Sequence, residues 1–535
     1  MKINRLLSTF CSLALILACA PQEKSPYSNN VIAAAHPLAS QAGKAMYAQG
    51  GNAFDAAIAA AFTLAVVEPS MSGLGGRLQA IYHTADGVVA GVDASTEVPK
   101  NYQPNEERHR YGYPTIGIPG VVAGLLKLHQ DRATLPLETL MAPAIAHAEN
   151  GFALLPGEAL RQAKEVEKLK TFSGSAHHFL TKDSLSIAAG ERLVQKALAN
   201  VLRKIATEGK AGFYEGEVAE AMADDIQQNG GILTQEDLKN YQARDARVVQ
   251  GKYQGHDIHS LYLPSFGAIT VQILQILDQL PKATTENQWA EHLGAATEIA
   301  YTYRKKQENE DSLQHILSYD QAAQWAKKIE LEQNNTVAYT ETTLPISWTS
   351  VDGHTTHLST VDQWGNAVSL TQTIGPNMGS RVATKGLGFL YAVTLGGYLG
   401  DYQPGDRANS HISPTIVTRD GSLTMALGAA GGSRIVTAIT QVLSRYLSQG
   451  HSLGKALTLP RVYPYQDSLW IENHSGLEYL NAQFDPSEFP VKYIDEPARF
   501  GRVHAIAKKQ GEATWLGAAD PDWEGTTQEV QANEK

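Results

Sequence analysis

The stretch that decides the fold is Gly353-His354-Thr355-Thr356-His357-Leu358-Ser359-Thr360-Val361-Asp362. Its composition predicts a strand over 355–362, and the turn-forming residues 363–366 lead to a second predicted strand over 367–373. A Thr hydroxyl inside a chain is a weak nucleophile. At the first position of a chain it becomes a good one, because the freed α-amine, with a pKa of about 8, takes the hydroxyl proton. Thr355 is therefore a candidate nucleophile if the chain is cut before it, and otherwise an ordinary strand residue.

A glycine-rich loop follows a second predicted hairpin. The hairpin comprises 415–419 and 422–427 around Asp420-Gly421, and a helix is predicted over 433–448. The two are joined by Gly428-Ala429-Ala430-Gly431-Gly432-Ser433-Arg434. Because Gly431 and Gly432 have no side chain, backbone N–H groups at the helix start can face a developing oxyanion. The alternative is a glycine turn that is needed only for its backbone angles.

The N-terminal half is predicted to be mainly helical. Asn52, with Asp55 three residues later, predicts the start of a helix that runs to about Val67, and this helix is apolar nearly all round. Residues 305–345 are charged and turn-forming, which predicts an exposed helix and a linker to the cut site. Strands at the nucleophile with helices elsewhere indicate an α+β fold.

Taken together, these segments resemble the γ-glutamyltransferase (γ-glutamyltranspeptidase) family of N-terminal-nucleophile hydrolases. The likeness covers most of residues 31–525. Besides the Thr355-Thr356-His357 run, it rests on motifs in the family's order and spacing: Gly117-Ile118-Pro119-Gly120, Ala142-Pro143-Ala144-Ile145, Gly230-Gly231-Ile232-Leu233 and Pro264-Ser265-Phe266-Gly267. The resemblance implies a four-layer αββα sandwich, no cofactor, and self-cleavage between His354 and Thr355. The products would be a large subunit, 31–354 after its tether, and a small catalytic subunit, 355–535, which remain together as a heterodimer.

The resemblance also implies roles for individual residues. They are Thr355 as nucleophile, Thr373 as its support, Gly431 and Gly432 as the oxyanion hole, and Ser410 and His411 at substrate-binding positions. From the sequence alone, Thr373 could equally be a polar position on a half-buried strand. No metal is expected, because no Cys or carboxylate set accompanies the histidines that flank the cut.

The residues with which the family holds a γ-glutamyl head group are changed in this chain. Ser95 stands where the family has an Arg, and the run 392–397, Ala-Val-Thr-Leu-Gly-Gly, replaces a run that contains acids and amides. His411 replaces one Ser of a pair. Since Arg pairs with a carboxylate and an acid pairs with an amine, the ligands of a free amino-acid head are lost together. Arg77 is a new cation that either replaces the missing Arg as a substrate ligand or is a surface charge.

Three functions remain open at this stage. The first is a self-processing Thr amidohydrolase or acyltransferase of the glutathione-hydrolase kind, which cleaves γ-glutamyl or related amides through an acyl-enzyme. The second is an acylase of changed specificity, resembling the cephalosporin acylases, for a small-molecule or peptide amide without the zwitterionic head. The third is a non-catalytic binding lipoprotein.

The N-terminus predicts export. A basic start and a short apolar core lead to Ile16-Leu17-Ala18-Cys19, which resembles a bacterial lipobox. The sequence therefore predicts a signal peptide over 1–18, a lipid on Cys19 as the only membrane attachment, and a polar tether over 19–30. Ala20 favours the outer membrane, facing the periplasm. A plain secretory signal is the alternative.

Composition excludes several other classes of protein. The only cysteines, Cys11 and Cys19, lie in the N-terminal segment, so the rest of the chain has no disulfide and no Cys nucleophile. The net charge of −11 argues against nucleic-acid binding. With 535 residues and 43% apolar content, a packed core is easily formed.

Overall fold

The computed structural model describes residues 25–104, 109–333, 354–397, 400–465, 468–473, 491–496, 499–522 and 524–532. The predicted signal peptide, Cys19 and most of the tether lie outside these ranges, as does residue 353 with the linker before it. No helix within them is long and apolar enough to cross a membrane.

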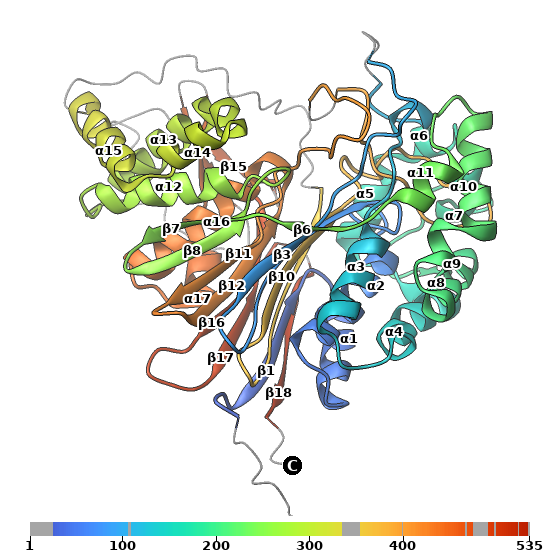
Figure 1. Cartoon of the computed structure of the whole chain (residues 1–535), viewed down its shortest axis with the longest axis horizontal. Coiled ribbons are helices and arrows are strands. Elements are labelled where there is room, and N and C mark those ends of the chain that lie inside the picture. Colours follow the sequence, from blue (N-terminus) through green and yellow to red (C-terminus); the bar gives the residue numbers. More distant parts are fainter. Residues whose placement is uncertain are drawn as a thin grey trace, which may run out of the picture.

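Two antiparallel sheets form the centre of the molecule (Figure 1). The strands of the seven-stranded sheet are, in spatial order, β18 (Thr526–Gln531), β1 (Asn29–Ala34), β9 (Thr356–Val361), β10 (Ala367–Thr373), β2 (Arg77–His83), β3 (Val89–Ala94) and β6 (Arg244–Ala246). The strands of the six-stranded sheet are β17 (Trp515–Ala519), β16 (Arg502–Lys508), β12 (Ser422–Ala430), β11 (Thr415–Arg419), β8 (His256–Leu261) and β7 (Val248–Tyr253). The sheets pack face to face through buried side chains that include Val31, Ile81, Val361, Ile416, Ile506 and Trp515.

Helices from the first half of the chain cover the outer face of the seven-stranded sheet (Figure 1). The larger ones are α1 (Pro37–Ala48), α2 (Ala53–Val67), α3 (Val121–Arg132), α4 (Leu137–Asn150), α8 (Lys196–Glu208) and α10 (Gly216–Gln228). Shorter elements are η1 (Tyr113–Thr115), α5 (Pro156–Ala163), α6 (Val166–Leu169), α7 (Ser173–Phe179), α9 (Ala211–Tyr214), α11 (Gln235–Asn240) and the pair β4 (Phe152–Ala153) and β5 (Arg192–Leu193). Every residue of α2 is buried, and Asn52 and Asp55 form a capping box at its start, as predicted.

A second helical layer covers the six-stranded sheet. It contains α12 (Gly267–Gln279), α13 (Glu286–Thr302), η2 (Arg304–Glu308), α14 (Glu310–Ile316), α15 (Tyr319–Gln333), η3 (Gly432–Arg434), α16 (Ile435–Leu443), η4 (Ser444–Ser448) and α17 (Leu453–Thr458). A small sheet of β13 (Val462–Tyr465), β14 (Ser468–Glu472) and β15 (Val491–Ile494) packs beside it. The order helix, sheet, sheet, helix confirms the predicted αββα sandwich.

The structure differs from two details of the sequence interpretation. The segment before the cut is not simply an exposed helix, because α15 buries Trp325 and Ile329 in the second helical layer. The predicted tether also ends early, since β1 begins at Asn29 and the Asn29 amide donates to the Trp515 carbonyl at 2.9 Å. In both places polar neighbours in the sequence conceal a buried face.

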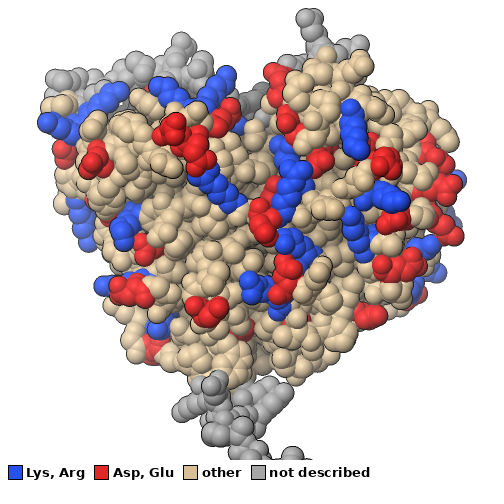
Figure 2. All heavy atoms as spheres, in the orientation of Figure 1, with Lys and Arg blue, Asp and Glu red and all other residues tan. Residues whose placement is uncertain are grey.

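Figure 2 shows one face of the molecule, on which Lys and Arg alternate with Asp and Glu. The described residues of this face form no extended basic surface.

Candidate functional site

The candidate nucleophile, Thr355, directly precedes β9, one of the inner strands of the seven-stranded sheet. Thr355 is buried, and its hydroxyl donates to the Thr373 hydroxyl oxygen at 3.1 Å. Thr373 is the last residue of β10, the neighbouring strand, and its hydroxyl also accepts from the Gly375 N–H at 3.0 Å. The structure therefore brings together the two threonines that the sequence predicts to act together.

The backbone at Thr355 is strained. Its φ is +137°, a region that β-branched residues seldom adopt and that costs of order 1–3 kcal/mol. The angle φ is defined by the carbonyl carbon of the preceding residue. Breaking the bond between His354 and Thr355 removes that atom from the angle, so cleavage at this bond would release the strain.

Charged side chains surround the bond between His354 and Thr355. Arg502 Nη2 donates to the Thr355 carbonyl oxygen at 3.3 Å, and the Thr356 hydroxyl donates to Glu68 at 2.6 Å. Glu68 in turn lies 3.8 Å from Arg161. All these side chains are buried.

The imidazole of His354 is buried among cations. Burial, followed by the charges of Arg381, Arg161 and Arg502, lowers its pKa to about 3. Its Nδ1 has no hydrogen-bond partner among the described residues. His354 is therefore neutral at physiological pH, and it lies beside guanidinium groups that can attract the carboxylate that cleavage would create.

His357, in β9 of the seven-stranded sheet, packs against β12 of the six-stranded sheet. Its Nδ1 lies 2.8 Å from the Thr371 hydroxyl and its Nε2 lies 3.0 Å from the Ser359 hydroxyl, and burial lowers its pKa to about 3. A Cβ atom at Gly428 would lie 2.4 Å from the ring, so only glycine fits there. The first glycine of the loop thus makes room for this histidine.

The predicted oxyanion loop connects β12 to the helix α16. Ala430, the last residue of β12, pairs with Arg502, which contacts Thr355, so the loop begins beside the candidate nucleophile. Gly431 and Gly432 both have positive φ, +143° and +57°. Their backbone N–H groups are donors of the kind that an oxyanion hole needs.

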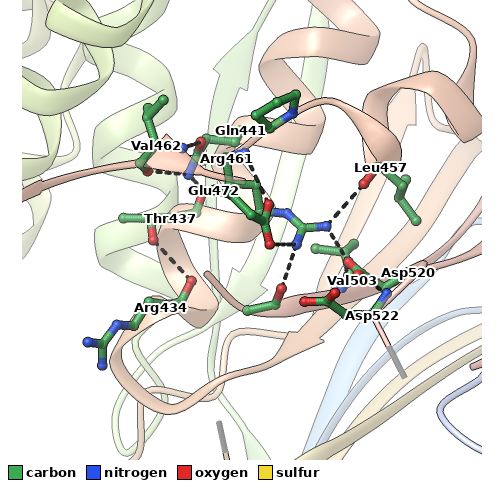
Figure 3. A network of polar contacts seen from close by, with 12 residues as sticks. Arg434, Thr437, Gln441, Leu457, Arg461, Val462, Glu472, Val503, Asp520 and Asp522 are labelled. Atoms are coloured by element: carbon green, nitrogen blue, oxygen red, sulfur yellow. Dashed lines mark hydrogen bonds and ion pairs between the residues drawn. The ribbon is translucent and has the colours of Figure 1, made fainter. Parts of the chain in front are cut away.

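A buried network of polar contacts around Arg461 lies next to this loop (Figure 3). Arg461 donates to the Gly501 carbonyl at 2.7 Å and forms an ion pair with Asp520, which also accepts from the Val503 N–H at 2.9 Å. Gly501 packs directly against Gly431, because a Cβ atom at Gly431 would come within 2.6 Å of the Gly501 Cα. The network thus fixes the backbone of 501–503, which carries Arg502, against the loop.

Arg77 is fully buried, so the interpretation as a surface charge is wrong. It lies opposite Thr373 in the register of β2 and β10. Its guanidinium donates to the carbonyl oxygen of Val393 and, at 3.3 Å, to that of Asn409. Arg77 therefore ties together two of the stretches that depart from the family pattern. Its role as a substrate ligand stays a prediction.

Ser410 and His411 lie in a cationic environment. Ser410 is buried and its N–H donates to the Pro264 carbonyl at 2.8 Å. His411 lies edge-on to Phe266, with ring centroids 4.6 Å apart, and the Arg304 guanidinium lies 4.4 Å from the same ring. Burial, followed by Arg304 and Arg434, lowers the pKa of His411 to about 3. The sequence analysis did not place either arginine near His411, although Arg434 is the last residue of the glycine-rich loop.

Ser95 does not take over the role of the missing Arg by itself. Its side chain is buried and accepts from the Gln79 amide at 2.7 Å. The nearby cation is Arg407, which lies 3.4 Å from Asp93 and 3.3 Å from Glu97. Arg407 is thus engaged by carboxylates of the protein.

The part of the chain that the structure describes contains no group of three or more His, Cys, Asp or Glu side chains arranged to hold a metal ion.

Comparison with known proteins agrees with this geometry. The γ-glutamyltranspeptidase family model matches residues 39–530. The chain is 31% identical to the glutathione hydrolase proenzyme of Pseudomonas sp. strain A14, over 96% of this chain and 97% of that protein. It is 30% identical to the acylase ACY 1 proenzyme of Pseudomonas sp. strain V22, over 93% of each chain. The cephalosporin acylase from Bacillus halodurans has the same fold, with a TM-score of 0.83 and 23% identity over 97% of this chain and 99% of that one. The chain belongs to the γ-glutamyltranspeptidase family.

Proposed function

We propose that the protein is a self-cleaving amidohydrolase or acyltransferase whose nucleophile is Thr355. The observation that carries this proposal is the state of Thr355 itself. It is a buried Thr with a strained φ that directly precedes β9, and its hydroxyl is bonded to Thr373. The family and the proenzyme names of two relatives support the same reading.

Cleavage would use the chain as its own substrate. The Thr355 oxygen attacks the His354 carbonyl carbon, the C–N bond breaks as an ester forms, and the hydroxyl proton passes to the new amine. Water then hydrolyses the ester. The products are a His354 carboxylate and a Thr355 with both a free hydroxyl and a free α-amine.

The catalytic cycle would use the same hydroxyl on an external amide. The α-amine takes the hydroxyl proton as the oxygen attacks the substrate carbonyl, and the N–H groups of Gly431 and Gly432 stabilise the resulting oxyanion. The proton then goes to the leaving amine, which departs and leaves an ester on Thr355. Water releases the acid in hydrolysis, and a second amine takes the acyl group in transfer.

A second candidate concerns the acyl group. An acylase of changed specificity is favoured by the absence of acid and amide side chains from 392–397 and by the cations around His411. A substrate ammonium would find no matching acid in this run. An amide whose acyl part lacks the α-amine fits these residues better than a γ-glutamyl compound does.

The mature protein is proposed to be a heterodimer of its own two fragments, held in the periplasm by a lipid on Cys19, most simply at the outer membrane. The lipobox-like residues 16–19 support this location. Replacing Cys19 with Ala should move the protein from the membrane fraction to the soluble fraction.

Intact mass spectrometry of the purified protein tests the proposal directly. The wild type should give two masses that meet between His354 and Thr355, and T355A should give one. T355S, which keeps a hydroxyl, should still be cut. A single uncut chain in the wild type would overturn the hydrolase proposal and favour a non-catalytic binding lipoprotein.

A further inference from the structure

We propose that Arg502 keeps the α-amine of Thr355, once cleavage has freed it, in its neutral, proton-accepting form. This inference rests on the proposed function, because the amine exists only after cleavage. It adds a residue to the machinery that neither the motifs nor the resemblance indicated.

The contact between Arg502 and Thr355 is direct. Arg502 is the first residue of β16, its side chain is buried, and its Nη2 lies 3.3 Å from the Thr355 carbonyl oxygen. The oxygen and the nitrogen of one residue are separated by three covalent bonds. The guanidinium nitrogen is therefore no farther than about 7 Å from the future amine.

A buried cation at this distance lowers the pKa of the amine. Burial lowers the pKa of Arg502 to about 10, so the guanidinium still carries its charge at neutral pH. A neighbouring positive charge disfavours the ammonium form of an amine. The neutral form is the one that can accept the hydroxyl proton, so Arg502 favours the catalytically competent state.

The other charged groups near this position are largely engaged with one another. Arg161 of α5 lies 3.0 Å from Glu158, and Arg381 lies 3.0 Å from Glu165. The charged groups near the cut come from several packed elements. They are Arg161 in α5, Lys164 directly after α5, Glu68 after α2, Arg381 after β10, and Arg502 in β16, with Asp520 and Asp522 near Arg502.

Of the three carboxylates in this set, Glu68 is the one bonded to the residue after Thr355, and its charge would favour an ammonium there. It already accepts from the Thr356 hydroxyl at 2.6 Å and lies 3.8 Å from Arg161. Arg502, in contrast, contacts Thr355 itself. Its charge is therefore the one whose removal should change the protonation of the amine most.

The position of Arg502 is fixed independently of Thr355. The Val503 N–H is held by Asp520, and the Gly501 carbonyl is held by Arg461, so the backbone on both sides of Arg502 is anchored. Substitution of the side chain should therefore leave the strand in place. Variants at position 502 that differ in charge but not in length can therefore be compared on the same backbone.

The pH dependence of activity separates an electrostatic role from a purely structural one. R502M keeps much of the length without the charge, and R502K keeps the charge. Both are first checked for cleavage by intact mass, and kcat/KM is then measured from pH 5 to 10 with a chromogenic anilide that the wild type hydrolyses.

For R502M we expect the acidic limb of the profile to move up by about one pH unit, with kcat/KM about tenfold lower at pH 7 and close to the wild type at the alkaline plateau. R502K should stay close to the wild type throughout. An equal loss at every pH in R502M would overturn the proposal and leave Arg502 as a group that only holds the Thr355 carbonyl.

A measurement on the wild type keeps the proposal testable even if R502M is not cut. The rate at which cyanate carbamylates the Thr355 amine is followed by mass spectrometry against pH, in native and in denatured protein. The native amine should titrate at lower pH than the denatured one. If it titrates at the same or higher pH, this inference fails while the proposed function stands; an uncut wild type would instead remove the proposed function.

Discussion

The two halves of the site have diverged to different degrees. The half that is proposed to form the nucleophile consists of Thr355, Thr373 and the Gly431-Gly432 loop, and it keeps the motifs on which the resemblance to the family rests. The half that would hold the acyl group departs from that pattern at Ser95 and over 392–397. The first half is built from strand register and backbone N–H groups, which the fold itself fixes. The second depends on side chains that loop segments carry, so it can change without disturbing the nucleophile half.

The most severe test of the nucleophile half is a pair of neighbouring glycine substitutions. In G431A the new Cβ would lie 2.6 Å from the Gly501 Cα, whose carbonyl Arg461 holds in place. In G432A nothing lies within 4 Å, and the φ of +57° costs an alanine only about 1 kcal/mol. We expect kcat/KM to fall by about 10²–10³ in G431A and by less than about tenfold in G432A.

Both variants are checked by circular dichroism and by intact mass, so that loss of folding or cleavage is separated from loss of catalysis. Equal losses in the two glycine variants would contradict the assigned geometry. Equal losses would also contradict the argument that the fold fixes the backbone of the nucleophile half.

A pair of substrates tests the acyl half. γ-Glutamyl-p-nitroanilide and glutaryl-p-nitroanilide differ in the α-amino group and share the same chain length. Because 392–397 offers no acid or amide, we expect the amine to bring no advantage, with the glutaryl compound hydrolysed within about tenfold of the γ-glutamyl compound or faster. The measurement is kcat/KM for each. A preference above about a hundredfold for the γ-glutamyl compound would show that other residues have rebuilt the amine site.

The sequence predicts the nucleophile half well, because its information is local. The strands β9 and β10, the β11–β12 hairpin and the capped start of α2 all follow from alternation, turn residues and an N-cap. The glycine loop lies between a strand and a helix, as predicted, although β12 runs on to Ala430. Such features depend on residues a few positions apart.

Tertiary contacts explain what the sequence could not show. Arg502 reaches Thr355 across 147 positions of the chain, and Arg461 meets Asp520 across 59. No local pattern marks an arginine as buried, so Arg77 could be taken for a surface charge. In α15 the charged positions hide the face that buries Trp325. Pairing between distant segments, not local propensity, sets these environments.

The smallest expected effect concerns the stability of the nucleophile half in acid. His504 is buried beside His357, with nearly parallel rings 6.4 Å apart, and burial, followed by His357 and Arg502, lowers its pKa well below 6.5. Neither ring nitrogen has a hydrogen-bond partner in the described ranges. Replacement by Leu should therefore remove a titratable group without leaving an unsatisfied partner.

The sign of the pH effect follows from which state binds the proton. Below pH 6.5 the unfolded chain protonates His504 whereas the native protein does not, so stability is lost as the pH falls. When the pH falls from 7 to 5, one such residue lowers the free energy of unfolding by about 2 kcal/mol. Between pH 7 and pH 5 we expect the free energy of unfolding to fall by about 2 kcal/mol less in H504L than in its parent. The free energy is measured by denaturant unfolding, with T355A as the parent so that the protein stays one chain. H177L, at an exposed position on α7, is the matched control and should follow the parent. If H504L followed the parent as well, His504 would be protonated in the native state, and the interior beneath the nucleophile half would have to be more open to water than its burial indicates.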